Sequence, residues 1–511
     1  MSATQTTRAA GILLHPTSLP SQHGIGDLGE GARRFIDWLS ECGVSRWQVL
    51  PLVPAGPGNS PYATPSAFAG HPLLVDLLAL RDDGLLDQDA MKAPAFALDT
   101  VDFEAVTAFK EARLTAAADA LLAGKNPRLK VELETFRHEA RWATDTATFL
   151  ALREARNGLP WWDWEPALRD RDPQAMASAS AAVQHRVAQH VCRFFFFEKQ
   201  WKALRAHAAQ RGIKIIGDVP IYVDRDSVDV WAHRDQFQLD AAGHPNAVAG
   251  VPPDFFSKLG QLWGNPLYDW GKMRADKHRW WVERLSRALE QVDLVRLDHF
   301  RGFSAYWEVP ADAPDARSGR WVPGPGRALF EDLRAALGDL PLIAEDLGVI
   351  DDDVEALRDG LSLPGMRILQ FAFGETAAHP FLPHNHTARS VAYTATHDND
   401  TTLGWWQTTT DRVRDHVRRY LAVSGHDIVW DLIRATFSSV SDLAVVPLQD
   451  VLCLDGRSRM NTPGLAEGNW GWRVRVQAFN VPLAQRLSEL ARLYGRLPPQ
   501  SGAASVSATK G

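Results

Sequence analysis

Residues 294–299 read LVRLDH, a short apolar run that ends in an aspartate and a histidine. Seven other segments share this pattern of a few Val, Ile or Leu residues followed by a polar side chain. Runs of this length and composition are typical of strands that are buried on both faces. The sequence therefore predicts a strand over 294–298 and seven more at 11–15 (GILLH), 47–52 (WQVLPL), 214–219 (KIIGDV), 342–346 (LIAED), 366–373 (MRILQFAF), 391–396 (VAYTAT) and 443–449 (LAVVPLQ).

Segments with helical periodicity lie between these strands. Residues 31–42, 280–291 and 327–337 each place large apolar side chains at the spacing of one helix face. Eight strands that alternate with helices predict an α/β protein with a (β/α)8 barrel, the TIM-barrel fold. A doubly wound open sheet is the competing α/β fold. The number of strands and the acidic residues at their C-terminal ends favour the barrel.

Two long intervals interrupt the alternation of strands and helices. We expect residues 1–511 to form a single catalytic barrel with insertions around its mouth. Residues 80–205, rich in Ala, Leu, Arg and Asp, predict a mostly helical insertion between the second and third strands. Residues 224–275, rich in Asp, Trp, Pro and Gly, predict long loops. The Ser, Ala, Gly and Pro content of residues 498–511 predicts a disordered tail.

The bulk composition argues against several classes of partner. A net charge of -7 and an isoelectric point near 6.2 do not provide the basic surface of a nucleic-acid binder. No apolar run approaches the 18 or so residues of a membrane span, and the polar start of the chain lacks a signal-peptide core. Three scattered cysteines favour a reducing compartment, so we expect a cytoplasmic protein.

Carboxylates lie at or just after the C-terminal ends of three of the predicted strands, namely Asp298, Glu345 and Asp398. The active site of a (β/α)8 barrel lies at the C-terminal ends of its strands, so these side chains are expected to meet in one pocket. Cleavage of a glycosidic bond needs a carboxylic acid and a carboxylate on either side of that bond. The strand ends therefore predict glycosidic bond chemistry. Glu345 is the expected general acid/base, because burial in the cleft would raise its pKa.

Side chains beside these acids suggest how each acid is held. Arg296 lies two residues before Asp298, so both side chains point to the same face of the strand. A neighbouring guanidinium keeps a carboxylate ionised, as a nucleophile requires, although a purely structural ion pair would look the same. Asp346 should point the other way and accept structural hydrogen bonds. His299 and His397 are expected to donate hydrogen bonds to sugar hydroxyls.

A metal site built from these histidines and aspartates is a third possible reading. It is disfavoured because the chain offers no closely spaced pair of the His-x-x-x-His type. We therefore expect neither a metal nor another cofactor.

Twelve short motifs follow one another along nearly the whole chain outside the helical insertion. They are 14–20 (LHPTSLP), 24–29 (GIGDLG), 59–62 (NSPY), 66–70 (SAFAG), 217–220 (GDVP), 250–254 (GVPPD), 263–266 (WGNP), 296–302 (RLDHFRG), 344–348 (AEDLG), 396–400 (THDND), 459–464 (RMNTPG) and 468–470 (GNW). This set resembles the amylomaltases or disproportionating enzymes, which are 4-α-glucanotransferases related to the α-amylase superfamily.

The resemblance implies a role for each carboxylate. Asp298 matches the nucleophile, Glu345 the acid/base and Asp398 the stabiliser of the transition state. The implied reaction moves α-1,4-glucan segments, including maltooligosaccharides, to the 4-OH of an acceptor. It retains the anomeric configuration through a covalent glucosyl–enzyme intermediate. A retaining mechanism predicts that the carboxyl groups of the nucleophile and the acid/base lie about 5–5.5 Å apart.

The resemblance also implies substrate contacts. Tyr62 and Asp218 match positions near the first donor sugar. Trp263, Asn265 and Asn469 fall in substrate-contacting segments, and Arg296, His299 and His397 complete the expected set.

One segment resembles a flexible loop of the family, and three residues differ from those usual in the family. Residues 250–263 resemble the flexible loop that lies over the acceptor cleft. His71, Ala395 and Leu465 stand where Asn, Gly and Thr are usual, which bears on fine specificity and removes no catalytic group.

Two other functions remain open from the sequence. An amylase-like hydrolase would use the same carboxylates, with water in place of the acceptor sugar. A non-catalytic glycan-binding protein would suit the 19 tryptophans, but it gives no reason for Arg296 to lie beside Asp298. We expect a monomer or a weak homo-oligomer that binds glucans.

Overall fold

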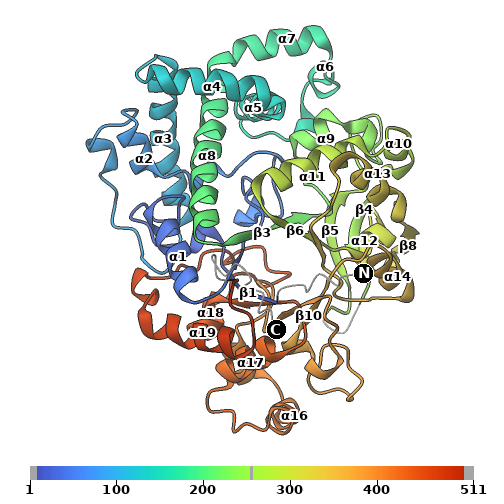
Figure 1. Cartoon of the computed structure of the whole chain (residues 1–511). Helices are drawn as coiled ribbons and strands as arrows, with labels where there is room; N and C mark the ends of the chain where they lie inside the picture. Colours follow the sequence, from blue (N-terminus) through green and yellow to red (C-terminus); the bar gives the residue numbers. More distant parts are fainter. Residues whose placement is uncertain (1–7, 254–256, 500–511) are drawn as a thin grey trace, which may run out of the picture.

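The computed structural model describes residues 8–253 and 257–499, and a closed barrel of parallel strands lies at its centre (Figure 1). Around the barrel the strands follow the order β1-β12-β11-β10-β9-β6-β3-β2. This closed order confirms the (β/α)8 barrel and excludes the open sheet. The strands are β1 (Ala9–Leu13), β2 (Arg46–Gln48), β3 (Lys214–Pro220), β6 (Leu294–Asp298), β9 (Leu342–Ala344), β10 (Gly365–Ile368), β11 (Ser390–Tyr393) and β12 (Leu443–Pro447).

The register of the strands determines which side chains share the rim of the barrel. Asp218 of β3 is opposite Arg296 of β6, and Pro220 is opposite Asp298. Leu297 of β6 is opposite Ala344 of β9, so the next residues along the chain, Asp298 and Glu345, reach the same level of the barrel. The C-terminal ends of β3, β6 and β9 therefore present their polar residues side by side.

Helices surround the barrel, and three of them match the helices expected from the sequence. These three are α1 (Glu30–Glu41), α11 (Arg279–Gln291) and α13 (Arg327–Leu337). The connection from β10 to β11 contains 3-10 turns in place of an α-helix. Other helices after β6 are α12 (Arg301–Ser304), α14 (Asp352–Gly360), α15 (Thr402–Thr408), α16 (Asp411–Leu421), α17 (Ile428–Ser438), α18 (Leu448–Val451) and α19 (Val481–Leu493).

Helices fill the interval between β2 and β3 and extend along the left side and the top of Figure 1. The last of them, α8 (Gln184–Gln210), leads directly into β3. Its four consecutive phenylalanines at 194–197 are all buried, and α8 packs against α1, α3 and α5. The others are α2 (Leu77–Asp82), α3 (Phe103–Leu122), α4 (Pro127–Glu139), α5 (Arg141–Glu154), α6 (Pro166–Arg169) and α7 (Pro173–Ala182).

Residues 224–275 correct the prediction of long loops. They contain β4 (Ala247–Val251) and β5 (Gln261–Pro266) besides the short helices α9 (Val228–Ala232) and α10 (Trp270–Ala275). With β7 (Ala305–Pro310) and β8 (Arg320–Pro323) these strands form an antiparallel sheet of order β5-β4-β7-β8. The prediction was wrong because β4 pairs with β7, which follows β6 and lies outside the interval.

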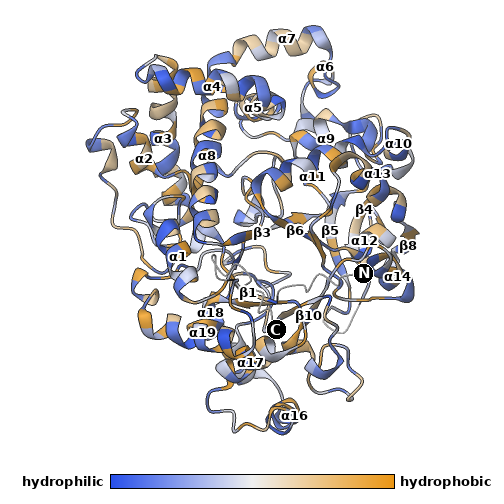
Figure 2. Cartoon of the chain, viewed as in Figure 1, coloured by the Kyte–Doolittle hydropathy of each residue, from blue (hydrophilic) through white to orange (hydrophobic). Residues whose placement is uncertain are grey.

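Helix α16 lies at the edge of the molecule, is mostly hydrophilic in Figure 2 and buries Val417. No helix among the described residues is long and apolar enough to cross a membrane. Apart from 498 and 499, the tail predicted over 498–511 lies outside the described residues, as do 254–256 within the expected lid.

Candidate active site

The three predicted carboxylates stand at the same rim of the barrel. Asp298 is the last residue of β6, Glu345 directly follows β9, and Asp398 lies in the turn after β11. Glu345 is buried, whereas the side chains of Asp298 and Asp398 are 27% and 41% exposed. The rim therefore offers one enclosed carboxyl group and two that are open to a ligand.

Arg296 bridges two carboxylates. One of its terminal nitrogens, Nη2, lies 2.8 Å from Oδ1 of Asp298, as the strand alternation predicts. The other, Nη1, donates to both oxygens of Asp218 at 2.8 and 2.7 Å. The side chain of Asp218 has 0% exposure, and burial raises its pKa while the Arg296 guanidinium opposes that shift. The buried guanidinium of Arg296 thus balances the negative charge of Asp218 and also orients Asp298.

Glu345 is held by backbone amides. Its Oε2 accepts the N–H of His299 at 2.6 Å, and its Oε1 accepts the N–H of Leu347 at 3.0 Å. Burial raises the pKa of Glu345 well above its usual value, and the charge of Asp298 adds to that shift. The pocket therefore favours the protonated form, which is the form that can donate a proton.

The neighbouring Asp346 is turned away from the cleft, as the alternation along the strand predicts. Its carboxylate accepts the N–H of Met366 at 2.6 Å and a terminal nitrogen of Arg358 at 2.6 Å. These contacts fasten the end of β9 to β10 and α14, and they leave Glu345 facing the opposite way.

His299 has an unusual backbone. Its φ of 51° lies in the left-handed region, which few residues other than glycine adopt. With this backbone its N–H reaches Glu345, while its ring packs edge-on against Trp263 with 4.7 Å between ring centroids. Burial lowers the pKa of His299 to about 4, so the imidazole is neutral at physiological pH. Within the described chain its Nε2 has no hydrogen-bond partner.

A second group of polar side chains connects Asp218 to Asp398. The hydroxyl of Tyr62 donates to Oδ2 of Asp218 at 2.8 Å and lies 2.8 Å from Nε2 of His397. The same Nε2 lies 3.2 Å from Oδ2 of Asp398. The rings of Tyr62 and His397 are stacked, with centroids 5.3 Å apart and planes 9° from parallel. The network fixes the floor of the site.

Trp470 is a residue to which the sequence reasoning gave no role. Its ring packs on those of Tyr62 and His397, with centroid distances of 5.9 and 6.1 Å. It lies within the motif at 468–470, so the motif pointed to the segment without indicating which side chain enters the site.

Three predicted contact residues lie further out. Trp263 on β5 is 37% exposed and covers His299. The amide of Asn265 donates to the carbonyl of Val223 at 2.9 Å. The amide of Asn469 accepts from the N–H of Thr462 and donates to the carbonyl of Leu465. Both asparagine amides therefore hold loops in shape.

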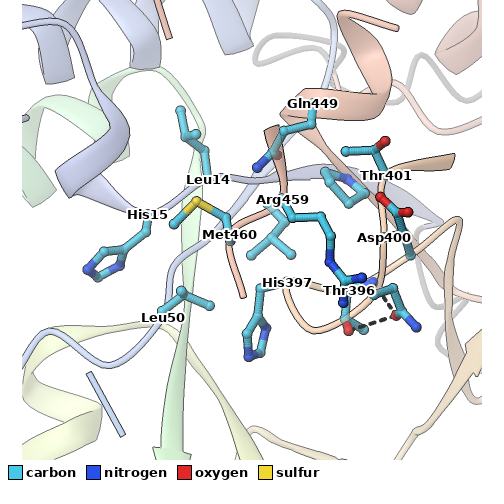
Figure 3. Close-up of a pocket in the computed structure, with 14 residues that line it drawn as sticks. Leu14, His15, Leu50, Thr396, His397, Asp400, Thr401, Gln449, Arg459 and Met460 are labelled. Carbon is cyan, nitrogen blue, oxygen red and sulfur yellow. Dashed lines mark hydrogen bonds between the residues drawn. The ribbon is translucent and has the colours of Figure 1, made fainter. Parts of the chain in front are cut away.

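A small cavity lies behind His397 (Figure 3). Its volume of about 20 Å³ is enough for a water molecule and far too small for a sugar. Arg459 and Met460 line it, and the dashed lines in Figure 3 mark hydrogen bonds that Thr396 donates to Asn399. A ligand is therefore expected at the rim, where the side chains of Asp298 and Asp398 are exposed, and not in this cavity.

The chain is similar to known proteins over nearly its whole length. Residues 14–478 match the family model described as 4-alpha-glucanotransferase. The chain belongs to the 4-alpha-glucanotransferase family. It is 47% identical to the 4-alpha-glucanotransferase of Thermus thermophilus over 499 residues, which cover 96% of this chain and 99% of that one. Identity to the chloroplastic/amyloplastic 4-alpha-glucanotransferase of Arabidopsis thaliana is 45% over 500 residues, covering 96% and 86% of the two chains.

A solved structure of the family has the same architecture. The amylomaltase from Streptococcus agalactiae, in complex with acarbose, superimposes with a TM-score of 0.93 at 37% identity, covering 96% of this chain and 100% of that one. The predicted resemblance is confirmed. The chain is an enzyme with 4-alpha-glucanotransferase activity, built on a (β/α)8 barrel.

Proposed function

We propose that this 4-alpha-glucanotransferase works by a retaining mechanism in which Asp298 is the nucleophile, Glu345 the acid/base and Asp398 the stabiliser of the transition state. Glu345 donates its proton to the glycosidic oxygen while an oxygen of Asp298 attacks the anomeric carbon, and the leaving glucan departs with a free hydroxyl. The 4-OH of an acceptor then gives its proton to Glu345 and attacks the same carbon. This attack breaks the ester bond to Asp298.

The unequal surroundings of Asp298 and Glu345 carry this proposal. Nη2 of Arg296 lies 2.8 Å from Oδ1 of Asp298 and orients its carboxylate. Glu345 is buried and faces the negative charge of Asp298, which together raise its pKa well above the usual value. A carboxylate held by a guanidinium and a buried carboxyl group with a raised pKa are suited to the roles of nucleophile and acid, respectively.

The substrates that we propose are maltooligosaccharides and longer α-1,4-glucans. The amylomaltase from Streptococcus agalactiae was solved with acarbose, and its 37% identity over 96% of the chain supports a related ligand class here. Tyr62, Asp218 and His397 are joined by hydrogen bonds in the floor of the site, where the first donor sugar would lie. Arg296 and His299 border the same position.

The sheet β5-β4-β7-β8 is proposed to favour transfer over hydrolysis. Its β4–β5 connection and β5 expose Leu259, Leu262 and Trp263. An apolar cover of this kind over a bound acceptor would exclude the water that otherwise attacks the intermediate.

We further propose that the whole chain acts as one catalytic unit in the cytoplasm. A reducing compartment suits the free thiols of Cys42, Cys192 and Cys453.

Incubation with maltotriose tests the reaction type. Transfer is expected to give glucose together with a ladder of longer maltooligosaccharides. Glucose and maltose as the sole products would instead indicate a hydrolase.

The carboxylate roles are tested with Glu345→Gln and Asp298→Asn. Each variant should lower turnover of maltotriose by about 10³- to 10⁴-fold or more, because each removes a group that reacts in the transition state. The exposed Asp312→Asn is the matched control and should keep the wild-type rate.

An activated donor separates the two roles. Maltosyl fluoride has a leaving group that needs no proton, so Glu345→Gln should still form the covalent ester and then accumulate it. Mass spectrometry of peptides should find the added maltosyl group on Asp298. A label on another residue, or its formation by Asp298→Asn, would contradict the assignment.

A further inference from the structure

We propose that Asn461, supported by Arg459, is a positioning residue that holds the carboxylate of Asp398 in its reactive orientation. The inference rests on the proposed role of Asp398 and extends it to a segment that follows β12, for which neither the motifs nor the comparisons provide a role.

Asp398 needs support that the other two acids already have. Asp298 ends a strand and contacts a guanidinium, and Glu345 is enclosed and held by two backbone N–H groups. Asp398 stands on a turn with its side chain 41% exposed, and Nε2 of His397 lies 3.2 Å from its Oδ2, which leaves Oδ1 to be held by another donor. An exposed side chain on a turn is free to change rotamer unless a neighbour fixes it.

The segment 459–461 runs alongside this turn and contacts both its backbone and its side chain. The amide nitrogen Nδ2 of Asn461 donates to Oδ1 of Asp398 at 2.6 Å, and the backbone N–H of Asn461 donates to the carbonyl of His397 at 3.1 Å. Nη2 of Arg459 donates to the carbonyl of Asp398 at 2.9 Å, and its Nε donates to the carbonyl of Asn461 at 3.1 Å. These four bonds fix the turn and the direction of its carboxylate.

The segment is itself firmly attached to the barrel mouth. The carbonyl of Met460 accepts the N–H of Trp470 at 2.6 Å, and both side chains are buried in the cluster that fills the barrel interior. Trp470 also packs on Tyr62 and His397. The support for Asp398 is therefore part of the packed core.

The chemistry of the donor matters as much as its position. A hydrogen bond to an ionised carboxylate is stronger than one between neutral groups, so the Asn461 amide can orient Asp398. Because the amide carries no net charge, it leaves the negative field of Asp398 available to the positive charge that develops on the sugar ring. A cation at this position would cancel part of that field.

The decisive variant is Asn461→Asp, which keeps the shape and replaces the donor. At pH 7 the new carboxylate can only accept, and it repels Asp398. At lower pH the two carboxyl groups share a proton, which restores an O–H donor to Asp398. We expect kcat on maltotriose to fall about 100-fold at pH 7, with KM changed less than about threefold. The ratio of variant to wild-type kcat should rise as the pH falls towards 5.

Two other variants complete the test. Asn461→Ala removes the donor without adding charge, so kcat should fall with a ratio to wild type that does not change with pH. Asn480→Asp matches the added charge at the N-cap of α19, where a carboxylate also accepts the N–H of Leu483, and it should behave as wild type. If Asn461→Asp does not fold, the kcat of Asn461→Ala decides alone.

The outcomes separate this inference from the proposed function. Wild-type kcat in Asn461→Ala, or a pH-independent ratio in a folded Asn461→Asp, would overturn the positioning role. In that case an inactive Asp398→Ala would leave the mechanism standing. An active Asp398→Ala would overturn the role of Asp398, and the inference with it.

Discussion

The two sides of the active site hold their acids in different ways. On the side of β3, β6 and β9, Asp218 and Asp298 share the buried guanidinium of Arg296. On the side of β11, Asp398 lies on a half-exposed turn and is held by the neutral amide of Asn461. The first side fixes charge inside the barrel, and the second fixes charge at the solvent boundary.

The difference follows from the cost of burial. A carboxylate enclosed by protein needs an opposite charge nearby, and loss of that partner leaves an uncompensated ion. A half-exposed carboxylate keeps part of its hydration, so a hydrogen-bond donor is enough to orient it. The β3–β6–β9 side should therefore contribute to folding as well as to catalysis, whereas the β11 side should contribute chiefly to catalysis.

The largest expected effect is the unequal loss of stability in Arg296→Leu and Asp398→Asn. Arg296→Leu leaves Asp218 buried without its cation, and the free energy of unfolding should fall by about 3–5 kcal/mol. Asp398→Asn changes a half-exposed group and should alter it by less than about 1 kcal/mol. Urea denaturation at pH 7 measures both values. Similar losses in the two variants would show that the two sides contribute equally to folding.

Two buried groups, Glu345 and His15, should make stability depend on pH with opposite signs. Glu345 has a raised pKa in the folded protein, so wild type should lose stability as the pH rises above about 4.5, the ordinary value. Glu345→Gln should not show that loss. Burial lowers the pKa of His15, beside His397, to about 3, so stability should be lost as the pH falls from 6.5 towards 3.

The size of the histidine effect can be bounded. Between pH 6 and pH 4, His15→Gln should reduce the slope of the free energy of unfolding against pH by up to about 1.4 kcal/mol per pH unit. Urea denaturation of the wild type and of both variants at a series of pH values tests the two effects. A steeper acid loss in His15→Gln, or an unchanged slope in Glu345→Gln, would contradict the assignment of signs.

The smallest expected effect is that of Asn469→Ala on the outer part of the β11 side. This variant removes the two hydrogen bonds that close the loop between Thr462 and Asn469, worth about 1 kcal/mol each at most. We expect KM for an acceptor such as glucose to rise a few-fold, with little change in kcat. Initial rates at varied glucose and fixed maltotriose measure this. A fall in kcat as large as that of Asn461→Ala would show that the loop and the turn act together.

Local patterns were enough to predict the barrel and two of its acids. Short runs of Val, Ile and Leu mark strands buried on both faces, and in a parallel barrel all their C-terminal ends meet at one rim. Asp298 and Glu345 were therefore found from their places at strand ends, and Arg296 from the two-residue alternation. Asp398 depended more on its motif, because a turn has no periodicity to read.

The sequence alone located the eight barrel strands, although several end earlier than predicted, and the face on which Arg296 and Asp298 lie, because these follow from spacing along one segment. The tertiary structure decided which partner each acid has. Asp218 meets Arg296 from 78 positions away, Asn461 meets Asp398 from 63, and β4 finds β7 beyond β6. Such pairs depend on how the barrel closes and on the register of its strands. The spacing of residues along a single segment does not reveal either.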